Sequence, residues 1–454
     1  MDTSSILRII EASKKDFETI SDSVWDHPEV CFKEVESTKV QMNFMKVRGF
    51  RITTPLAEMK TAFMAEYGNG SPVIAILGEN DALAGLSQKA DVAHEDAIAA
   101  GGNGHGCGHN LLGTAGMEAV YALKTYMEEN ALPGTIRYYA CPAEEGGGGK
   151  VFLSRAGVFD DVDCALTWHP GTDNRVDNAG LACVTFNLTY HGTAAHAAVD
   201  PWNGRSALDA VELLNVGVQF LREHVKPDTR IHYSILDCGG SAPNIVQHTA
   251  KVMYCVRARL SADMEDVYRR VLKVADGAAL MTETTLDPPE IINVYNGFVA
   301  NPTLDRLLLK HIKAVLPLDY TEEELAYARR FQACGVDKDA AFPVNMVIDE
   351  RLDPAPVGST DVADVSHVTP TSVAKVSTAA IGTPWHSWMV TAQGKSSIAK
   401  KGMHAAAAVL ALSALDLFLD PSLVAQVHSD FMEATQGAAY HTMLPAAKKP
   451  QNFE

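Results

Sequence analysis

The sequence predicts an α/β protein of two domains. The larger domain has a mixed or parallel sheet with helices on both faces, and a smaller ferredoxin-like α+β domain is inserted into it. Strands and helices alternate through the first part of the chain, as they do in parallel sheets. Residues 73–78 form an unbroken apolar run, which is typical of a strand buried on both faces. The order β-α-β-β-α-β that follows indicates the ferredoxin-like unit.

Each element follows from the spacing of its apolar residues. The main domain is predicted from residues 1–183 and 299–454, and the inserted domain from residues 184–298. Helical spacing predicts helices at 4–27, 34–48, 111–130, 149–156, 204–224, 263–281, 302–316, 321–333, 396–418 and 421–435. Alternating or continuous apolar runs predict strands at 61–67, 73–78, 135–141, 164–168, 184–190, 230–237, 250–257, 290–295 and 373–381. Residues 335–372 fit neither pattern, and loops of that length often line functional sites.

Composition limits the class of protein. The 454 residues are 47% hydrophobic and 21% charged, which is ordinary for a soluble enzyme of two or three domains. A net charge of -18 argues against nucleic acid or an anionic membrane as partner. The first residues lack the apolar segment of a signal peptide, and no window approaches the ~20 apolar residues of a membrane helix. Eight scattered cysteines predict reduced thiols, so we expect a cytoplasmic protein.

The stretch Gly104–Asn110 carries three side chains that can bind soft metals, separated by glycines. Glycine permits tight backbone turns, so side chains two residues apart can face one point. Cys107 and His109 are the predicted ligands. The predicted helix 111–130 follows directly, and its positive end favours the thiolate of Cys107 that binds metal. The alternative is a glycine-rich turn with a buried cysteine and an unrelated histidine.

Polar side chains follow three of the predicted strands. Asp81 follows residues 73–78, Glu144 and Glu145 follow residues 135–141, and His169 follows residues 164–168. Open α/β sheets bind ligands at the carboxyl ends of their strands. We therefore expect these side chains to converge there with Cys107 and His109.

The adjacent pair Glu144 and Glu145 has a specific use. Successive side chains on an extended segment point in opposite directions, so one carboxylate can bind a metal while the other reaches water. The four glycines 146–149 would allow a close approach to the backbone. The alternative is a solvated acidic turn, which is the usual environment of Glu-Glu.

Two further histidines would complete a metal site. Alone, His169 and His386 would each be ordinary structural histidines. Together with the earlier candidates they give one thiolate, three imidazoles and one carboxylate: Cys107, His109, His169, His386 and Glu145. That mixture suits zinc or a similar divalent ion, and it suffices for two ions with a shared ligand. Such ions polarise a carbonyl and lower the pKa of water to about 7. Signatures of serine or cysteine catalysis, phosphate loops and dinucleotide binding are absent from the sequence.

Several motifs resemble the aminoacylase/carboxypeptidase family, metallopeptidase family 20. They are Gly104–Asn110, Pro142–Gly146, Trp168–Pro170, His191–Ala197 and Gly239–Val246. The closer resemblance is to the family's amidohydrolase branch of the aminobenzoyl-glutamate hydrolase type, which Gly78–Leu86 and Ser359–Ser366 also match. The likeness runs over nearly the whole chain. Residues 335–357 match poorly, and Asn110 stands where many relatives, though not this branch, have Asp.

The resemblance implies a two-metal hydrolase of amide bonds with an inserted lid or dimerisation domain. Cys107 would be the ligand that bridges the two ions, and His109, Glu145, His169 and His386 would be the other ligands. Glu144 would be the catalytic base. In the lid, His196 would reach a neighbouring active site to stabilise an oxyanion, and Asn244 and Arg257 would hold substrate oxygens.

The resemblance leaves more than one activity open. The favoured function is hydrolysis of an N-acyl or N-aroyl amino acid, such as an aminobenzoyl-glutamate-like compound, with two divalent ions of zinc or manganese per chain. The alternatives are a dipeptidase of the same family and a metal-bound component of a pair that needs its partner chain for activity. We expect a homodimer, with a possible hetero-partner, and no nucleic-acid or membrane partner.

Overall fold

The main domain contains an eight-stranded sheet within residues 3–353 and 358–451, the part of the chain that the computed structural model describes. The strand order is β1-β2-β4-β3-β5-β13-β6-β12. The bounds are β1 Arg51–Thr53, β2 Phe63–Asn69, β3 Val73–Gly78, β4 Gly134–Ala140, β5 Cys164–Gly171, β6 Asn174–Val176, β12 Ile348–Asp349 and β13 Thr371–Ser377. The central strands β4, β3, β5 and β13 run parallel, whereas β1, β2 and β6 pair antiparallel with their inner neighbours. The prediction of a mixed or parallel sheet is confirmed, and the sheet is of the mixed kind.

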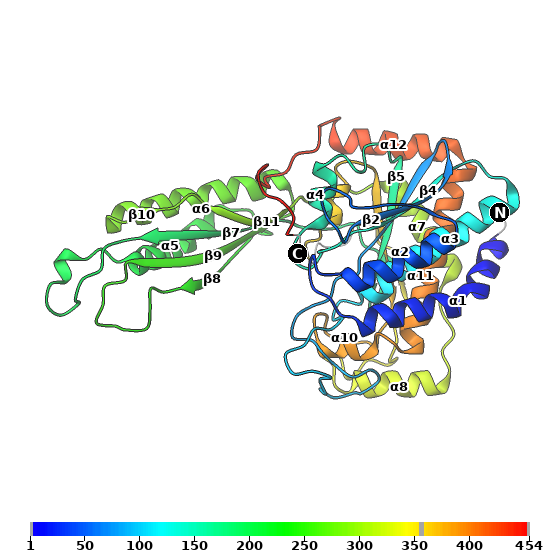
Figure 1. The fold of residues 1–454 in the computed structure, drawn as a ribbon, viewed down its shortest axis with the longest axis horizontal. Helices are drawn as coiled ribbons and strands as arrows, with labels where there is room; N and C mark the ends of the chain where they lie inside the picture. The colour runs from blue at the N-terminus through cyan, green and yellow to red at the C-terminus, as the bar shows by residue number, and fades with distance from the viewer. Residues whose placement is uncertain (1–2, 354–357, 452–454) are drawn as a thin grey trace.

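Helices cover both faces of this sheet, as predicted (Figure 1). Their bounds are α1 Thr3–Asp26, α2 Val35–Val47, α3 His109–Asn130, α4 Gly149–Arg155, α7 Pro302–Val315, α8 Glu322–Gln332, α9 Val362–Val365, α10 Trp388–Gln393, α11 Ser397–Leu419 and α12 Pro421–Thr435. Local sequence accounts for several helix starts. For example, Thr321 and Glu324 form a capping box at the start of α8, and Ser396 caps α11.

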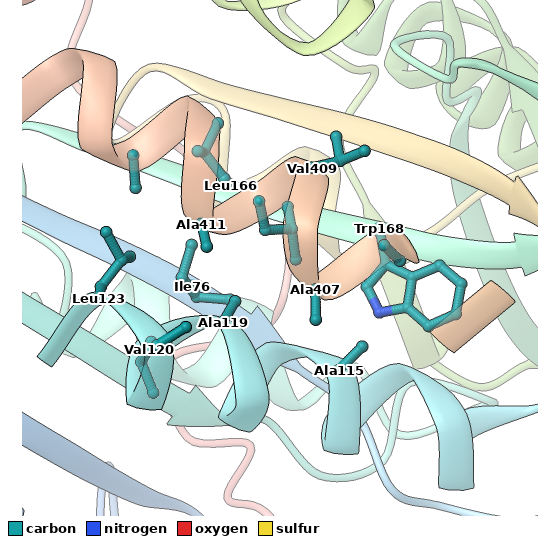
Figure 2. Close-up of a cluster of buried hydrophobic side chains, with 14 of the residues drawn as sticks. Ile76, Ala115, Ala119, Val120, Leu123, Leu166, Trp168, Ala407, Val409 and Ala411 are labelled. Carbon is teal, nitrogen blue, oxygen red and sulfur yellow. The ribbon is translucent and has the colours of Figure 1, made fainter. Parts of the chain in front are cut away.

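Strand β3 shows how the sheet builds two cores. Ile74 and Ile76 face the core formed with α1, α3, α7 and α11, while Ala75 and Leu77 face the core formed with α4 and α9. Figure 2 shows Ile76 and Leu166 of the sheet among alanines of α3 and α11, including Ala115 and Ala407. Small side chains let these two helices approach each other closely over the sheet. The strand ends that carry polar residues are therefore held on a rigid base.

Helix α11 is apolar around most of its circumference. Among the described residues it is the one helix with the length and apolarity to cross a membrane, with a mean hydropathy of 1.7. We expected no stretch of the sequence to be as long and apolar as a membrane helix, and that expectation is wrong for α11. However, 94% of the apolar window is buried, because α11 packs on α3, α7, β5 and β13. Its apolarity is accounted for by this packing.

The second domain projects from the first as an elongated arm (Figure 1). Its elements are β7 Ala182–His191, α5 Ala207–Leu221, β8 Arg230–Asp237, β9 Thr249–Ala258, α6 Ser261–Thr282, β10 Thr285–Leu286 and β11 Glu290–Tyr295, with 3-10 turns at Pro201–Asn203 and Arg222–His224. The strand order β11-β7-β9-β8 is antiparallel throughout, and α5 and α6 pack on the sheet. The predicted ferredoxin-like unit is confirmed. The exact boundaries 184–298 remain a prediction.

The structure differs from the sequence expectation in small elements. The short strands β1, β6, β10 and β12 were not expected, because two or three residues carry no periodicity. The unassigned segment 335–372 contains β12, helix α9 and the start of β13. Its residues 354–357 lie outside the described part of the chain.

Candidate active site

The polar residues that follow the strands converge at the carboxyl edge of the main sheet. A cavity of about 510 Å³ there is lined by Cys107, Glu144, Glu145, His169 and His386. Glu79 and Glu145 follow the adjacent parallel strands β3 and β4, and His169 lies on β5 next to β3. The expected convergence at this edge is therefore observed.

Three groups of side chains bring metal-binding atoms within 4.8 Å of one another. The groups are Cys107 with His109 and His169, Cys107 with Glu145 and His386, and Glu79 with His109 and Glu144. The first two share Cys107. In them, Cys107 Sγ lies 3.4 Å from His169 Nε2, and Glu145 Oε2 lies 3.3 Å from His386 Nε2. Two nitrogen or oxygen ligands of one zinc ion lie about 3.4 Å apart in a tetrahedral arrangement, so this spacing fits a divalent ion.

Unpaired buried atoms support the same fit. His109 Nε2 and Glu145 Oε1 are buried and have no hydrogen-bond partner among the described residues, and they lie 3.9 Å apart. A buried polar atom without a partner is costly, and two such atoms that face each other among potential ligands are suited to hold a cation between them. The residues present therefore fit a metal centre.

The loop that carries Glu144 and Glu145 is a turn, so the expectation of an extended segment is wrong. Ala143 has a positive φ of 63°, and its carbonyl accepts hydrogen bonds from the N–H groups of Gly147 and Gly148 at 3.0 and 2.7 Å. Buried Glu34 accepts the N–H of Ala143 at 2.9 Å. These contacts turn the chain and place both carboxylates at the cavity.

The glycines after the pair are closely packed, as expected from the sequence. A Cβ at Gly149 would lie 1.9 Å from the carbonyl oxygen of Pro142, and a Cβ at Gly147 would lie 2.5 Å from the ring of Phe32. Only glycine fits at both positions. The turn is therefore fixed by packing.

Burial dominates the electrostatics of the site. Burial, and then the charges of Glu79 and Asp361, raise the pKa of Glu144 well above its usual value. Burial likewise raises the pKa of the Cys107 thiol, and the positive charge of His109 opposes that shift. Burial therefore acts against the thiolate that we expected the helix end to favour. Burial, and then the charge of His109, lower the pKa of His169 to about 4.

Sequence reasoning missed a buried ion network beneath the cavity. Lys150 is fully buried, and its ammonium lies 2.5 Å from Glu79 Oε1 and 2.7 Å from Asp361 Oδ1. Glu79 Oε2 in turn lies 3.3 Å from His109 Nε2. The position of Glu79 at a strand end was a usable signal. Lys150 lies in the first turn of α4 and carried no comparable signal, because its partner Asp361 is distant in sequence.

The inserted domain contributes Arg257 to the cavity, whereas His196 and Asn244 are not among its lining residues. Strand β7 leaves the main domain at Ala182, and Ala182 pairs with Ala258 at the near end of the sheet. The segments with His196 and Asn244 therefore lie at the far end (Figure 1). His196 Nδ1 accepts a hydrogen bond from Ala198 N, which leaves Nε2 to carry the proton.

Comparison with known proteins identifies the family. A profile of the peptidase family M20/M25/M40 matches residues 81–231, and a peptidase dimerisation domain matches residues 182–281. The chain is 40% identical, over 97% of each chain, to a protein of Escherichia coli (strain K12) that is named as one of the subunits of p-aminobenzoyl-glutamate hydrolase. It belongs to the M20 peptidase family. Like these relatives, it is a hydrolase that acts on amide bonds.

Two further proteins are similar to this chain at lower sequence identity. The Xaa-Arg dipeptidase of Mus musculus is 28% identical over 93% of this chain and 90% of its own. The crystal structure of a dinuclear metal-binding M20 peptidase from Bacillus subtilis superposes with a TM-score of 0.58 at 19% identity, covering 88% of this chain and 99% of that one. At that identity the likeness concerns the fold alone.

Proposed function

We propose that the protein is a metal-dependent amidohydrolase that cleaves the amide bond of an N-acyl or N-aroyl amino acid. One observation carries this proposal. Two groups of potential metal ligands share Cys107, and Cys107 and Glu144 line the same cavity. The relative named for p-aminobenzoyl-glutamate supports an aroyl amino acid as the substrate class.

In this proposal, five side chains hold two divalent ions, with zinc and manganese as the candidates. Cys107 is shared, His109 and His169 complete one group, and Glu145 and His386 complete the other. When bound, the ions polarise the amide carbonyl and acidify water. The mixed thiolate, imidazole and carboxylate set suits such ions.

Glu144 is the proposed general base and acid. A carboxyl group whose pKa is raised by burial can take a proton from attacking water and then give it to the leaving nitrogen. Glu144 lines the cavity beside the proposed ligand Glu145. Arg257, which lines the same cavity, binds the substrate carboxylate.

The exposed edge strand of the inserted domain supports a role for this domain in dimer formation. Strand β8 forms the outer edge of its sheet, where Tyr233, Ile235 and Leu236 are 43–49% exposed. An exposed apolar edge strand is suited to pairing with another strand. We propose a homodimer in which this edge pairs and His196 and Asn244 serve the partner's site, where the Nε2–H of His196 can stabilise an oxyanion.

Two other functions remain alternatives, each favoured by one observation. Similarity to the Xaa-Arg dipeptidase favours a dipeptide substrate. The Escherichia coli relative is named as one component of an enzyme with more than one kind of chain, which favours a protein that needs a different partner for activity. We also propose a cytoplasmic location, because all eight cysteines lie among the described residues and are free thiols.

A hydrolysis screen of the purified protein tests these functions. The panel contains N-acyl amino acids, N-aroyl amino acids and dipeptides, each assayed with added manganese, zinc or cobalt. We expect hydrolysis of an N-acyl or N-aroyl amino acid that chelators abolish. Faster hydrolysis of dipeptides would favour the dipeptidase, and activity only after a related chain is added would favour the two-chain enzyme. Turnover that persists without metal would reject the proposal.

A further inference from the structure

Two cysteines of the inserted domain lie side by side next to the active-site cavity. Cys183 is on β7 and lines the cavity, and Cys255 is on the neighbouring strand β9. Their sulfur atoms are 3.5 Å apart and share a hydrogen bond in which either thiol can be the donor. Both are free thiols. The proposed catalytic centre uses neither of them, so the pair needs an explanation of its own.

Strand pairing holds the two thiols together. Cys183 is the register partner of Arg257, and Cys255 is the register partner of Thr185, so the cysteines are diagonal neighbours in an antiparallel pair. Both lie on the face of the sheet opposite α5 and α6, because Val184, which points the other way, lies in the core that these helices cover. A disulfide has a sulfur–sulfur distance of about 2.05 Å, so the sulfurs would approach by roughly 1.5 Å. Rotation of the two side chains with a small shift of the strands can supply that movement.

Access and charge favour a reaction at Cys255. This residue is half-buried, so a small oxidant can reach it. The hydrogen bond with Cys183 outweighs the effect of burial and, together with the charge of Arg257, lowers the pKa of Cys255 to about 5. The thiolate is the form of cysteine that oxidants attack. Cys238 and Cys334 are more exposed, but their thiols bond backbone oxygens and not a second sulfur.

The thiol pair also faces Arg257, which we propose binds the substrate carboxylate. Burial acts to lower the pKa of the guanidinium, whereas the charges of Cys183 and Cys255, and a hydrogen bond with Cys255, raise it above its usual value. Arg257 also donates a hydrogen bond to Ser359 Oγ at 3.0 Å. A disulfide carries no charge. Its formation would therefore remove the thiolate beside the guanidinium and leave Arg257 free to bind a carboxylate.

We propose that Cys183 and Cys255 form a modification site, where a hydroperoxide oxidises the two thiols to a reversible disulfide beside Arg257. The Cys255 thiolate attacks the peroxide, so an S–O bond forms, the O–O bond breaks, and the leaving oxygen takes up a proton from solvent. The sulfur of Cys183 then attacks Cys255, so the S–S bond forms, the S–O bond breaks, and water leaves with the Cys183 proton. The two thiols lose two electrons in total, which the peroxide gains. The site is independent of the proposed function, whereas its effect on Arg257 rests on that function.

Peptide mapping of the zinc-loaded protein tests the disulfide, since zinc does not itself react with peroxide. The wild type, Cys183→Ser, Cys255→Ser and the control Cys334→Ser are treated with increasing hydrogen peroxide, alkylated and digested without reductant. We expect a peptide that joins residues 183 and 255 in the wild type and in Cys334→Ser, and dithiothreitol should reverse it. The other two variants should lack this cross-link. The inference is overturned if the two thiols stay free while exposed Cys238 is oxidised, or if they are oxidised without joining.

Kinetics of the same samples test the effect on Arg257, with a substrate found in the hydrolysis screen. Oxidation should lower the KM of the wild type by about threefold or more and change kcat little, because the freed guanidinium binds the substrate carboxylate. Cys255→Ser removes the same thiolate, so its KM should already be low and should not respond to peroxide. Equal KM values for the reduced and oxidised wild type would reject the effect on Arg257. If no compound is hydrolysed, the proposed function and this effect both fail, while peptide mapping still decides the disulfide.

Discussion

The Nδ1 atom of His109 lies 3.0 Å from both the backbone oxygen and Oδ1 of Asp81. Nδ1 therefore donates to Asp81, and Nε2 is the ring atom that faces the cluster. The second oxygen of Asp81 accepts the N–H of Glu145 at 2.9 Å. One buried carboxylate thus orients two of the proposed metal ligands.

Asp81→Asn should weaken metal binding without removing a ligand. The amide cannot replace the carboxylate at both contacts, so we expect metal affinity to fall by about 10- to 100-fold. Competition with a chromogenic chelator measures it. Asp416→Asn is the control, because Asp416 is a buried partner of His311 at 2.8 Å outside the cavity. Equal affinity in the two variants would mean that Asp81 does not orient the site.

The sequence predicted the convergence at the sheet edge because parallel strands place their carboxyl ends together. It also predicted the packing of Gly147 and Gly149, since four successive glycines have little other use. It could not predict the turn at Glu144, which depends on the positive φ of Ala143 and on Glu34, a residue distant in the chain.

The burial of Lys150 is a second feature that could not be predicted from the sequence. In sequence Lys150 is an ordinary helix residue, and its burial follows from the path that brings Asp361 beside it. Charge pairs between residues far apart in the chain leave no periodic pattern.

Lys150→Met should destabilise the protein strongly. The change leaves Glu79 and Asp361 buried without their counter-ion, which costs about 3–5 kcal/mol of unfolding free energy. Urea unfolding followed by circular dichroism measures it. Lys39→Met, which removes an exposed lysine paired with Glu36, should cost about 1 kcal/mol at most. Similar losses in both variants would contradict a structural role for the buried network.

Cys107→Ala should remove metal and activity together, since Cys107 belongs to both proposed ligand groups. Elemental analysis of the dialysed protein should give about two ions per wild-type chain and fewer than one in the variant. Cys164→Ala, which alters a buried thiol of β5 outside the cavity, should keep both ions. Full metal content in Cys107→Ala would reject the shared thiolate.

Mixing two inactive variants should restore activity if the site is shared between the two protomers. His196→Ala and Glu144→Ala each disable one component, and a mixed dimer then contains one complete site. Random mixing should restore about a quarter of wild-type activity. Absence of recovery in mixed dimers verified by mass spectrometry would show that His196 does not act across the interface.

Glu144→Gln tests the mechanism most directly. Glutamine keeps the shape of the side chain and removes its ability to take a proton, so kcat should fall by at least the ~10²–10⁴ of a lost general base. KM should change little, because the lost interaction belongs to the transition state. Metal content should be unchanged, since Glu145 and not Glu144 is the proposed ligand.

The control for Glu144→Gln is Glu118→Gln, a buried glutamate of α3 that bonds His404 at 2.7 Å outside the cavity. It should lower stability and leave kcat within about twofold of wild type. If Glu144→Gln also keeps kcat within about threefold, another residue is the base. If it instead loses metal, Glu144 and Glu145 have exchanged roles. The short distances that join Glu79, His109 and Glu144 into one group make that exchange physically accessible, so metal content and kcat must be measured on the same sample.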